Sequence, residues 1–162
     1  MKYFVICYKI IIIIFNNVIM RFNIMVIAKQ TNQNSYEIDL TCRNFLLKSD
    51  KHGSDIAPSP YDYIKTALAS CTAITIRMYA QRKNLSIQDI EVRVNYSRNS
   101  DGTENFDREV LLTQSQKIAD SEKITDDILQ RITDIVNRCP VAKTLHTATT
   151  TFNTITKLVD SI

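Results

Sequence analysis

One stretch of the sequence, from Ser59 to Lys83, most constrains the fold because it reads as a single long and almost wholly apolar helix. Its start carries three helix signals: Ser59 suits the N-cap, Pro60 suits the first helical position, and Asp62 completes a capping-box-like arrangement. Residues 64–76 are apolar or small nearly all round, and a helix that is apolar on every face must be buried on every face. A chain of 162 residues can hardly surround such a helix alone, so we expect a second subunit to cover part of it.

The segments around this helix show strand and helix periodicities. We expect a first hairpin from residues 26–28 and 36–42, extended by 45–47, and a second antiparallel pair from 87–96 and 106–113. Asn84 suits the position just after the long helix. A second helix is expected over 122–138 and should end at Cys139-Pro140, because proline cannot continue a helix. A last strand is expected at 147–157. The sequence therefore predicts one α+β domain with antiparallel sheets around a long, central, buried helix.

The charge of the chain argues against a nucleic-acid-binding protein. The formal net charge is +3, but four basic residues and no acidic ones lie in the first thirty positions. The remainder has 16 basic and 17 acidic residues with the signs interspersed. No basic patch remains that could follow a phosphate backbone.

Residues 1–25 differ in composition from residues 26–162, which we expect to form the folded domain. Residues 4–15 are an apolar run broken only by Lys9, which is shorter than the roughly 20 apolar residues that span a bilayer. The run would suit a signal peptide, yet no small-x-small cleavage site follows it. Three interpretations stay open: upstream translation with a functional start at Met20 or Met25, an uncleaved anchor or signal, or an ordered part of the fold. We favour the first, and expect no stable association with a membrane.

Two of the four cysteines stand in positions that suit a thiol active site. Cys71 lies in the middle of the apolar helix and Cys139 lies where the second helix ends, so the two could close and open a disulfide during turnover. The alternative is that a small cysteine in an Ala-rich helix simply packs. Cys42 is expected to be a small buried hydrophobe in a strand. No C-x-x-C spacing and no clustered histidines occur, so we expect no metal site.

The position of Cys71 poses an electrostatic problem. The thiolate is the reactive form, and a free thiol with a pKa of about 8.5 is mostly protonated at neutral pH. Cys71 lies in the middle of the helix, where the helix dipole stabilises a thiolate only weakly. Apolar burial raises the pKa of a thiol. A cation from elsewhere in the fold is therefore needed.

Four segments of the chain, residues 57–62, 67–73, 78–83 and 138–145, resemble the OsmC/Ohr family of osmotically inducible and organic hydroperoxide resistance proteins. The resemblance extends from about Val26 to the C-terminus, with both cysteine motifs in the family's order. It implies an intertwined, cytoplasmic homodimer in which Cys71 attacks an organic hydroperoxide and Cys139 resolves the product. It also implies that no cofactor takes part and that an external dithiol, such as a lipoyl protein, reduces the disulfide.

The resemblance further implies an arginine from the first hairpin, held by an acid at the helix start, beside the reactive thiol. Arg43 is the arginine near that hairpin, although it could equally be a solvated charge at a strand end. In hydroperoxide resistance proteins the acid directly follows the proline, where this chain has Tyr61; Asp62 comes one residue later and has a capping role of its own. Ala142 stands where many relatives have histidine, which leaves His146 as a distant substitute.

These patterns lead to two hypotheses about function. The first is a thiol-dependent peroxidase that reduces organic hydroperoxides to alcohols through the two cysteines. A pocket lined by Tyr63, Met78, Tyr79 and Phe106 would favour bulky organic hydroperoxides over hydrogen peroxide, although these aromatic residues could equally be core. The second is a non-catalytic OsmC-like stress-response or small-ligand-binding protein, in which both thiols stay reduced and inert.

Overall fold

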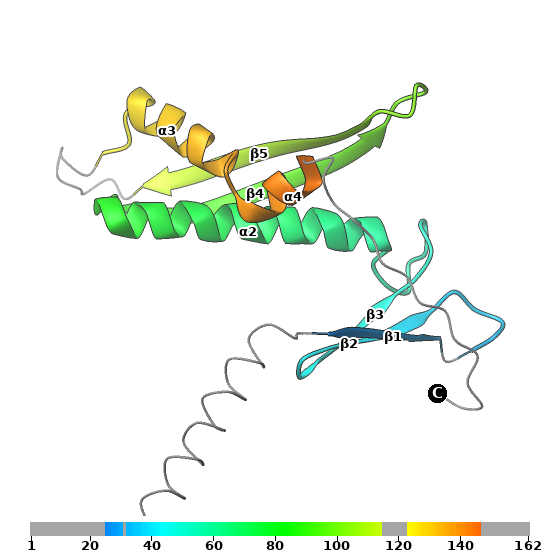
Figure 1. Ribbon diagram of the computed structural model, residues 1–162. Helices are drawn as coiled ribbons and strands as arrows, with labels where there is room; N and C mark the ends of the chain where they lie inside the picture. Colours follow the sequence, from blue (N-terminus) through cyan, green and yellow to red (C-terminus); the bar gives the residue numbers. More distant parts are fainter. Residues whose placement is uncertain (1–24, 31, 115–122, 147–162) are drawn as a thin grey trace, which may run out of the picture. The chain divides into compact units, whose positions relative to one another are not determined.

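The computed structural model describes residues 25–30, 32–114 and 123–146 (Figure 1). These residues form an α+β fold of antiparallel strands and helices, which agrees with the α+β class and the antiparallel sheets that were predicted. The chain divides into two compact units, residues 1–63 and 64–162, so that the boundary falls in the first turn of the long helix. The N-terminal apolar run and the strand predicted at 147–157 lie outside the described residues.

The first unit contains a three-stranded antiparallel sheet in the order β1-β2-β3. Its strands are β1 (Val26–Gln30), β2 (Ile38–Cys42) and β3 (Phe45–Ser49). The predicted hairpin is confirmed, and the segment expected to extend it pairs with β2 as a third strand. Arg43 lies in the turn between β2 and β3, where its φ of 58° is in the left-handed region.

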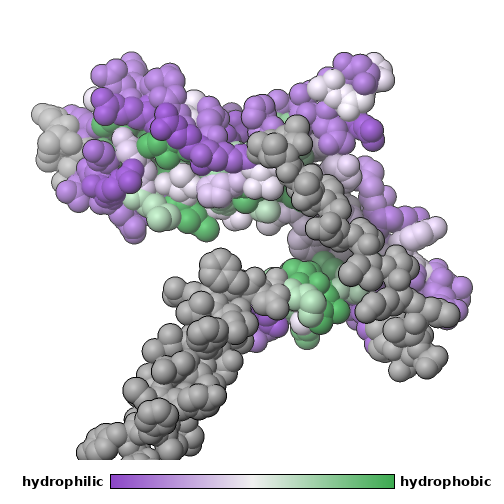
Figure 2. All heavy atoms as spheres, viewed as in Figure 1, coloured by the Kyte–Doolittle hydropathy of each residue, from purple (hydrophilic) through white to green (hydrophobic). Residues whose placement is uncertain are grey.

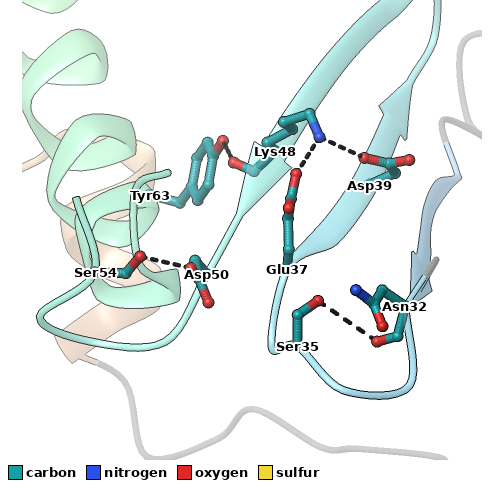
Figure 3. Close-up of polar contacts among 8 residues, drawn as sticks. All are labelled: Asn32, Ser35, Glu37, Asp39, Lys48, Asp50, Ser54 and Tyr63. Carbon is teal, nitrogen blue, oxygen red and sulfur yellow. Dashed lines mark hydrogen bonds and ion pairs between the residues drawn. The ribbon is translucent and has the colours of Figure 1, made fainter. Parts of the chain in front are cut away.

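Polar contacts hold the end of β3 and the loop after it (Figure 3). Lys48 on β3 forms ion pairs with Glu37 and Asp39, and the Ser54 hydroxyl donates to the Asp50 carboxylate at 2.5 Å. The Tyr63 hydroxyl donates to the backbone carbonyl of Lys48. Tyr63 therefore ties the first turn of the following helix to β3, and is not part of the substrate pocket predicted for it.

The long helix α2 (Pro60–Lys83) begins and ends as predicted. The N–H of Ser59 donates to the Asp62 carboxylate at 2.9 Å, and the N–H of Asp62 donates to the Ser59 hydroxyl at 3.3 Å, which is a reciprocal capping box. At the other end Asn84 has a φ of 52°, and the N–H of Leu85 reaches back to the carbonyl of Ala80 at 2.9 Å. The Asp62 carboxylate thus has a structural role at the helix start.

The second unit contains a hairpin and two shorter helices besides α2. The hairpin is formed by β4 (Ile87–Arg98) and β5 (Glu104–Gln114), which pair antiparallel as predicted. Helix α3 (Asp126–Val136) starts later than expected, after its N-cap Thr125, and ends before Asn137. The prediction that Pro140 only ends a helix was incomplete, because Pro140 also begins helix α4 (Pro140–His146). Proline is favoured at a first helical position, where its missing N–H needs no partner.

Helices α2 and α3 pack on the same face of the β4–β5 hairpin. The buried cluster joins side chains from all of these elements: Ile76, Tyr79, Ala80, Ile87, Ile132 and Val136. Half-buried residues of the hairpin, including Ile90 and Leu112, complete it. The core thus fixes the C-terminal part of α2 against the end of α3, and the segment that follows α3 carries Cys139.

Candidate active site

The structure brings the two cysteines singled out from the sequence into direct contact. The Sγ atoms of Cys71 on α2 and Cys139 lie 2.8 Å apart, although the residues are 68 positions apart in the chain. Cys139 lies between α3 and α4, where its carbonyl accepts the N–H of Lys143 at 3.0 Å. Little movement separates this contact from a disulfide bond of about 2.05 Å.

Cys71 is less buried than its apolar helix predicted, and it is the less buried of the two thiols. Cys139 is fully buried, with 0% of its surface exposed, whereas Cys71 is half-buried. The reason is that the helix around Cys71 is not covered on every side within the described chain: Ile74 is 60% and Met78 is 65% exposed. Reagents from solvent can therefore reach Cys71 before Cys139.

A groove of about 1050 Å³ runs along α2 and opens onto Cys71. Apolar side chains gather along α2 on the face of the molecule seen in Figure 2. The groove is lined from α2, α3 and α4 by Ala67, Ser70, Cys71, Ile74, Thr75, Met78, Tyr79, Gln81, Arg82, Ile135, Pro140 and Val141. Met78 and Tyr79 thus line the same groove as Cys71, as predicted. Phe106 instead lines a second cavity and packs against Tyr96, with ring centroids 5.2 Å apart.

The two thiols differ in their acidity. Burial raises the pKa of the Cys71 thiol above its ordinary value, and the adjacent Cys139 raises it further. Burial alone would raise the pKa of Cys139 as well. Hydrogen bonds from the Cys71 thiol and from the N–H groups of Ala142 and Val141, together with the charge of Arg108, instead bring the pKa of Cys139 below its ordinary value. When one of the two adjacent thiols is ionised, Cys139 is therefore the one that carries the negative charge, and Cys71 keeps its proton.

Arg108 on β5 is a cation near the thiol pair that was not among the predicted site residues. Its guanidinium donates to the Thr72 hydroxyl at 3.0 Å and to the Asn137 side-chain oxygen at 2.9 Å, next to the segments that carry the two cysteines. A signal for it was present, because Arg108 alternates with Phe106, Val110 and Leu112 on the inward face of β5. A charge in register with apolar residues on one face of a strand indicates a buried or half-buried partner.

The other residues proposed from the resemblance have the following surroundings in the structure. Arg43 and Tyr61 are exposed residues of the first unit, Arg43 in a turn and Tyr61 in the first turn of α2. Asp62 caps α2, and His146 lines the second cavity rather than the groove. A role for Arg43, Tyr61 or Asp62 in catalysis stays a prediction.

Neither a metal cluster nor a membrane-spanning helix occurs in the part of the chain that the structure describes. Over residues 25–30, 32–114 and 123–146, no group of three or more His, Cys, Asp or Glu side chains could hold a metal ion. None of the helices in these ranges is long and apolar enough to cross a bilayer.

Comparison with known proteins identifies a family and a fold. Residues 51–154 match the family model described as OsmC-like protein. A search of curated proteins found no match.

Several solved structures share the fold. An OsmC-like protein from Mycoplasma pneumoniae is 22% identical, with a TM-score of 0.56 over 78% of this chain and 89% of that one. A putative osmotic stress induced and detoxification response protein from Psychrobacter arcticus is 23% identical, with a TM-score of 0.55 over 74% and 87%. The organic hydroperoxide resistance protein OhrB of Bacillus subtilis is 14% identical, with a TM-score of 0.52 over 76% and 90%.

Proposed function

The chain belongs to the OsmC-like protein family, and on that premise we propose that it is a thiol peroxidase that reduces organic hydroperoxides to alcohols. The observation that carries the proposal is the 2.8 Å contact between the Cys71 and Cys139 sulfur atoms. A cysteine that only packs has no need of a second thiol in contact with it. The names of structural relatives such as the hydroperoxide resistance protein of Bacillus subtilis point to the same chemistry.

The proposed cycle starts at Cys71, because its sulfur is the one that faces the groove. The Cys71 sulfur attacks the terminal oxygen of the hydroperoxide, the O–O bond breaks, and the remaining alkoxide takes a proton to leave as the alcohol. The proton of the Cys71 thiol passes to the adjacent Cys139 thiolate, which thereby serves as the base. Cys139 then condenses with the Cys71 sulfenic acid to give a disulfide and water. An external dithiol reduces the disulfide, and no bound cofactor takes part.

The groove supports an apolar substrate. Ile74, Met78 and Tyr79 lie along it on the same helix as Cys71, so that the organic part of a hydroperoxide would contact apolar side chains. Each buried CH₂ group contributes roughly 0.8 kcal/mol, a contribution that hydrogen peroxide cannot obtain. We therefore expect cumene or lipid hydroperoxide to react faster than hydrogen peroxide.

A second copy of the chain would complete this groove. The exposed Ile74 and Met78 follow Cys71 along a helix whose opposite face is core, and large exposed apolar patches mark interaction surfaces. We propose a homodimer in which the partner covers this face of α2. Light scattering on the purified protein tests it, and a monomer at micromolar concentration would contradict it.

The rival proposal is an OsmC-like binding or stress-response protein with inert thiols. Two observations favour it: Tyr61 stands where hydroperoxide resistance proteins have an acid, and burial raises the pKa of the Cys71 thiol. An unreactive Cys71 would fit that role.

A thiol count separates the two proposals. Free thiols are counted in denaturant before and after one equivalent of cumene hydroperoxide. The wild-type chain should lose two thiols per chain, Cys139→Ser should lose one, and Cys71→Ser should lose none, since a serine hydroxyl forms no comparable anion at neutral pH. Cys42→Ser is the matched control and should behave as the wild type. No loss in the wild-type chain would favour the binding protein, and a loss in Cys71→Ser would reverse the two roles.

A further inference from the structure

Arg108 occupies a position that a purely structural arginine would rarely take. It lies half-buried on the inward face of β5, in register with Phe106 and Val110. Burying a charge among apolar side chains costs free energy unless the charge is paired or hydrogen-bonded. The hydrogen-bond partners of Arg108 therefore indicate the role of its charge.

The guanidinium of Arg108 joins the two segments that carry the cysteines. One of its nitrogens donates to the hydroxyl of Thr72, the residue after Cys71, and the other donates to the side chain of Asn137, two residues before Cys139. Thr72 is fully buried, and its own hydroxyl proton is donated to the Leu68 carbonyl at 2.7 Å. The Thr72 oxygen thus has only acceptor capacity left for Arg108, which fixes the direction of this bond.

The shape of the guanidinium matters for this arrangement. Its planar fork reaches two acceptors on different elements at once, whereas a lysine ammonium would act as a point charge. The fork therefore sets α2 and the junction after α3 in one relative position. The 2.8 Å contact between the two sulfur atoms lies within the region held in this way.

The charge of Arg108 acts mainly on the buried sulfur. Burial lowers the pKa of Arg108, but an arginine in a protein keeps its proton at all ordinary pH values. In the described chain, the groups that act on the Cys139 sulfur are Cys71 from α2, Arg108 from β5 and the N–H groups at the start of α4. The charged or titratable side chains of Glu104, Lys143 and His146 line the second cavity together with Arg108. Arg108 thus helps to lower the pKa of Cys139.

The two sulfur atoms play different parts when a disulfide between them is reduced. The Cys71 sulfur faces the groove, so an incoming thiolate would bond to Cys71, and the electron pair of the broken S–S bond would pass to Cys139. The second thiolate of a dithiol then attacks the reductant's own sulfur in the mixed disulfide and releases Cys71. A thiol of lower pKa is the better leaving group in this exchange.

We propose that Arg108 is a positioning residue for the thiol pair, which fixes the two cysteine-bearing segments and stabilises the Cys139 thiolate that leaves when an external thiol opens the disulfide at Cys71. The part of this inference that concerns turnover rests on the proposed function. The titration and disulfide exchange of the two thiols do not, because both can be measured without a peroxide.

The first test titrates Cys139 alone. In a Cys7→Ser, Cys42→Ser, Cys71→Ser background, the thiolate absorbance of Cys139 is followed against pH. Arg108→Met should move the midpoint to higher pH and reduce the thiolate fraction at neutral pH, as expected for the loss of a nearby opposite charge. Arg108→Lys, which keeps the charge, should restore most of the thiolate. Arg93→Met, on the outward face of β4, is the matched control and should change nothing; His146→Gln shows whether the histidine contributes.

The second test follows the opening of the disulfide. The pair is oxidised with diamide, so that the result does not depend on peroxidase activity, and then reacted with a monothiol. Peptide mass mapping should find the mixed disulfide on Cys71, and Arg108→Met should react several-fold more slowly than Arg93→Met. Arg108→Lys should close the disulfide more slowly than the wild type, because the two-point attachment is lost.

Two results would overturn the inference: a mixed disulfide on Cys139, or a Cys139 titration that is unchanged in folded Arg108→Met. If Arg108→Met does not fold, Arg108→Gln carries the test, since it keeps a hydrogen-bond donor without the charge. An unchanged titration in that variant would likewise overturn it. A protein that fails to consume peroxide but passes both tests would refute only the proposed function.

Discussion

Replacing Ile132 on α3 with alanine should destabilise the protein by about 3 kcal/mol. Ile132 is 4% exposed and packs in the buried cluster with Ile76 and Ala80 of α2. Alanine lacks about three carbon groups of isoleucine, and at roughly 0.8 kcal/mol each the lost transfer free energy is about 2.4 kcal/mol. The cavity left behind adds to this, because a core closed by two helices and a hairpin relaxes only in part.

Urea unfolding followed by circular dichroism measures the loss in the free energy of unfolding. The measurement is made at two protein concentrations, so that any stabilisation by association with a second copy of the chain is detected. Ile132→Val should lose only about 1 kcal/mol, since it removes a single carbon. Leu129→Ala is the matched control on the same helix: Leu129 is 44% exposed, so its loss should be smaller than that of Ile132→Ala. A loss below about 1 kcal/mol for Ile132→Ala, or equal losses for Leu129→Ala and Ile132→Ala, would show that α3 does not pack as described.

Three further predictions concern the cap, the end of α2 and the thiol pair. Ser59→Ala should lower the free energy of unfolding by about 1 kcal/mol, measured in urea, because it removes the hydroxyl that caps α2; no loss would contradict the capping box. Asn84→Gly should raise the free energy of unfolding by up to about 1 kcal/mol in the same assay, because glycine adopts a left-handed backbone without steric cost; a lower value would contradict this. Cys139→Ser should lower the pKa of Cys71, because it removes the contribution of the adjacent thiol and leaves that of burial. Alkylation of Cys71 by iodoacetamide should then begin at a lower pH than in the wild type. An unchanged pH profile of alkylation would refute the effect of Cys139 on Cys71.

The features predicted correctly are those with a local cause. The capping box of Ser59 and Asp62 and the C-terminal Asn84 depend on neighbouring residues, so they could be recognised from the sequence. The pairing of β4 with β5 followed from the alternation of apolar and polar residues on both sides of a glycine turn.

The features that were missed depend on contacts distant in sequence. The burial of Cys139 and the exposure of Cys71 are set by how α2, α3 and α4 pack, which no local pattern reveals. Helix α4 was not predicted because Pro140 can follow the end of one helix and also begin another, and the local sequence does not distinguish the two. The contacts of Arg108 join β5 to α2 and to the end of α3, so they depend on the tertiary packing, although the charge on the apolar face of β5 is visible in the sequence.

The contacts of Arg77 have a consequence for local opening of the fold. Its guanidinium, from α2, donates to the backbone carbonyls of Ile87 at 2.6 Å and Gln88 at 3.1 Å, at the point where the register of β4 on β5 shifts. The irregular start of β4 is thereby fastened to the helix as well as to its partner strand. The amide hydrogens of the last turns of α2 and of the first residues of β4 should therefore exchange with solvent as one cooperative unit, whose protection falls along its whole length when Arg77 is replaced.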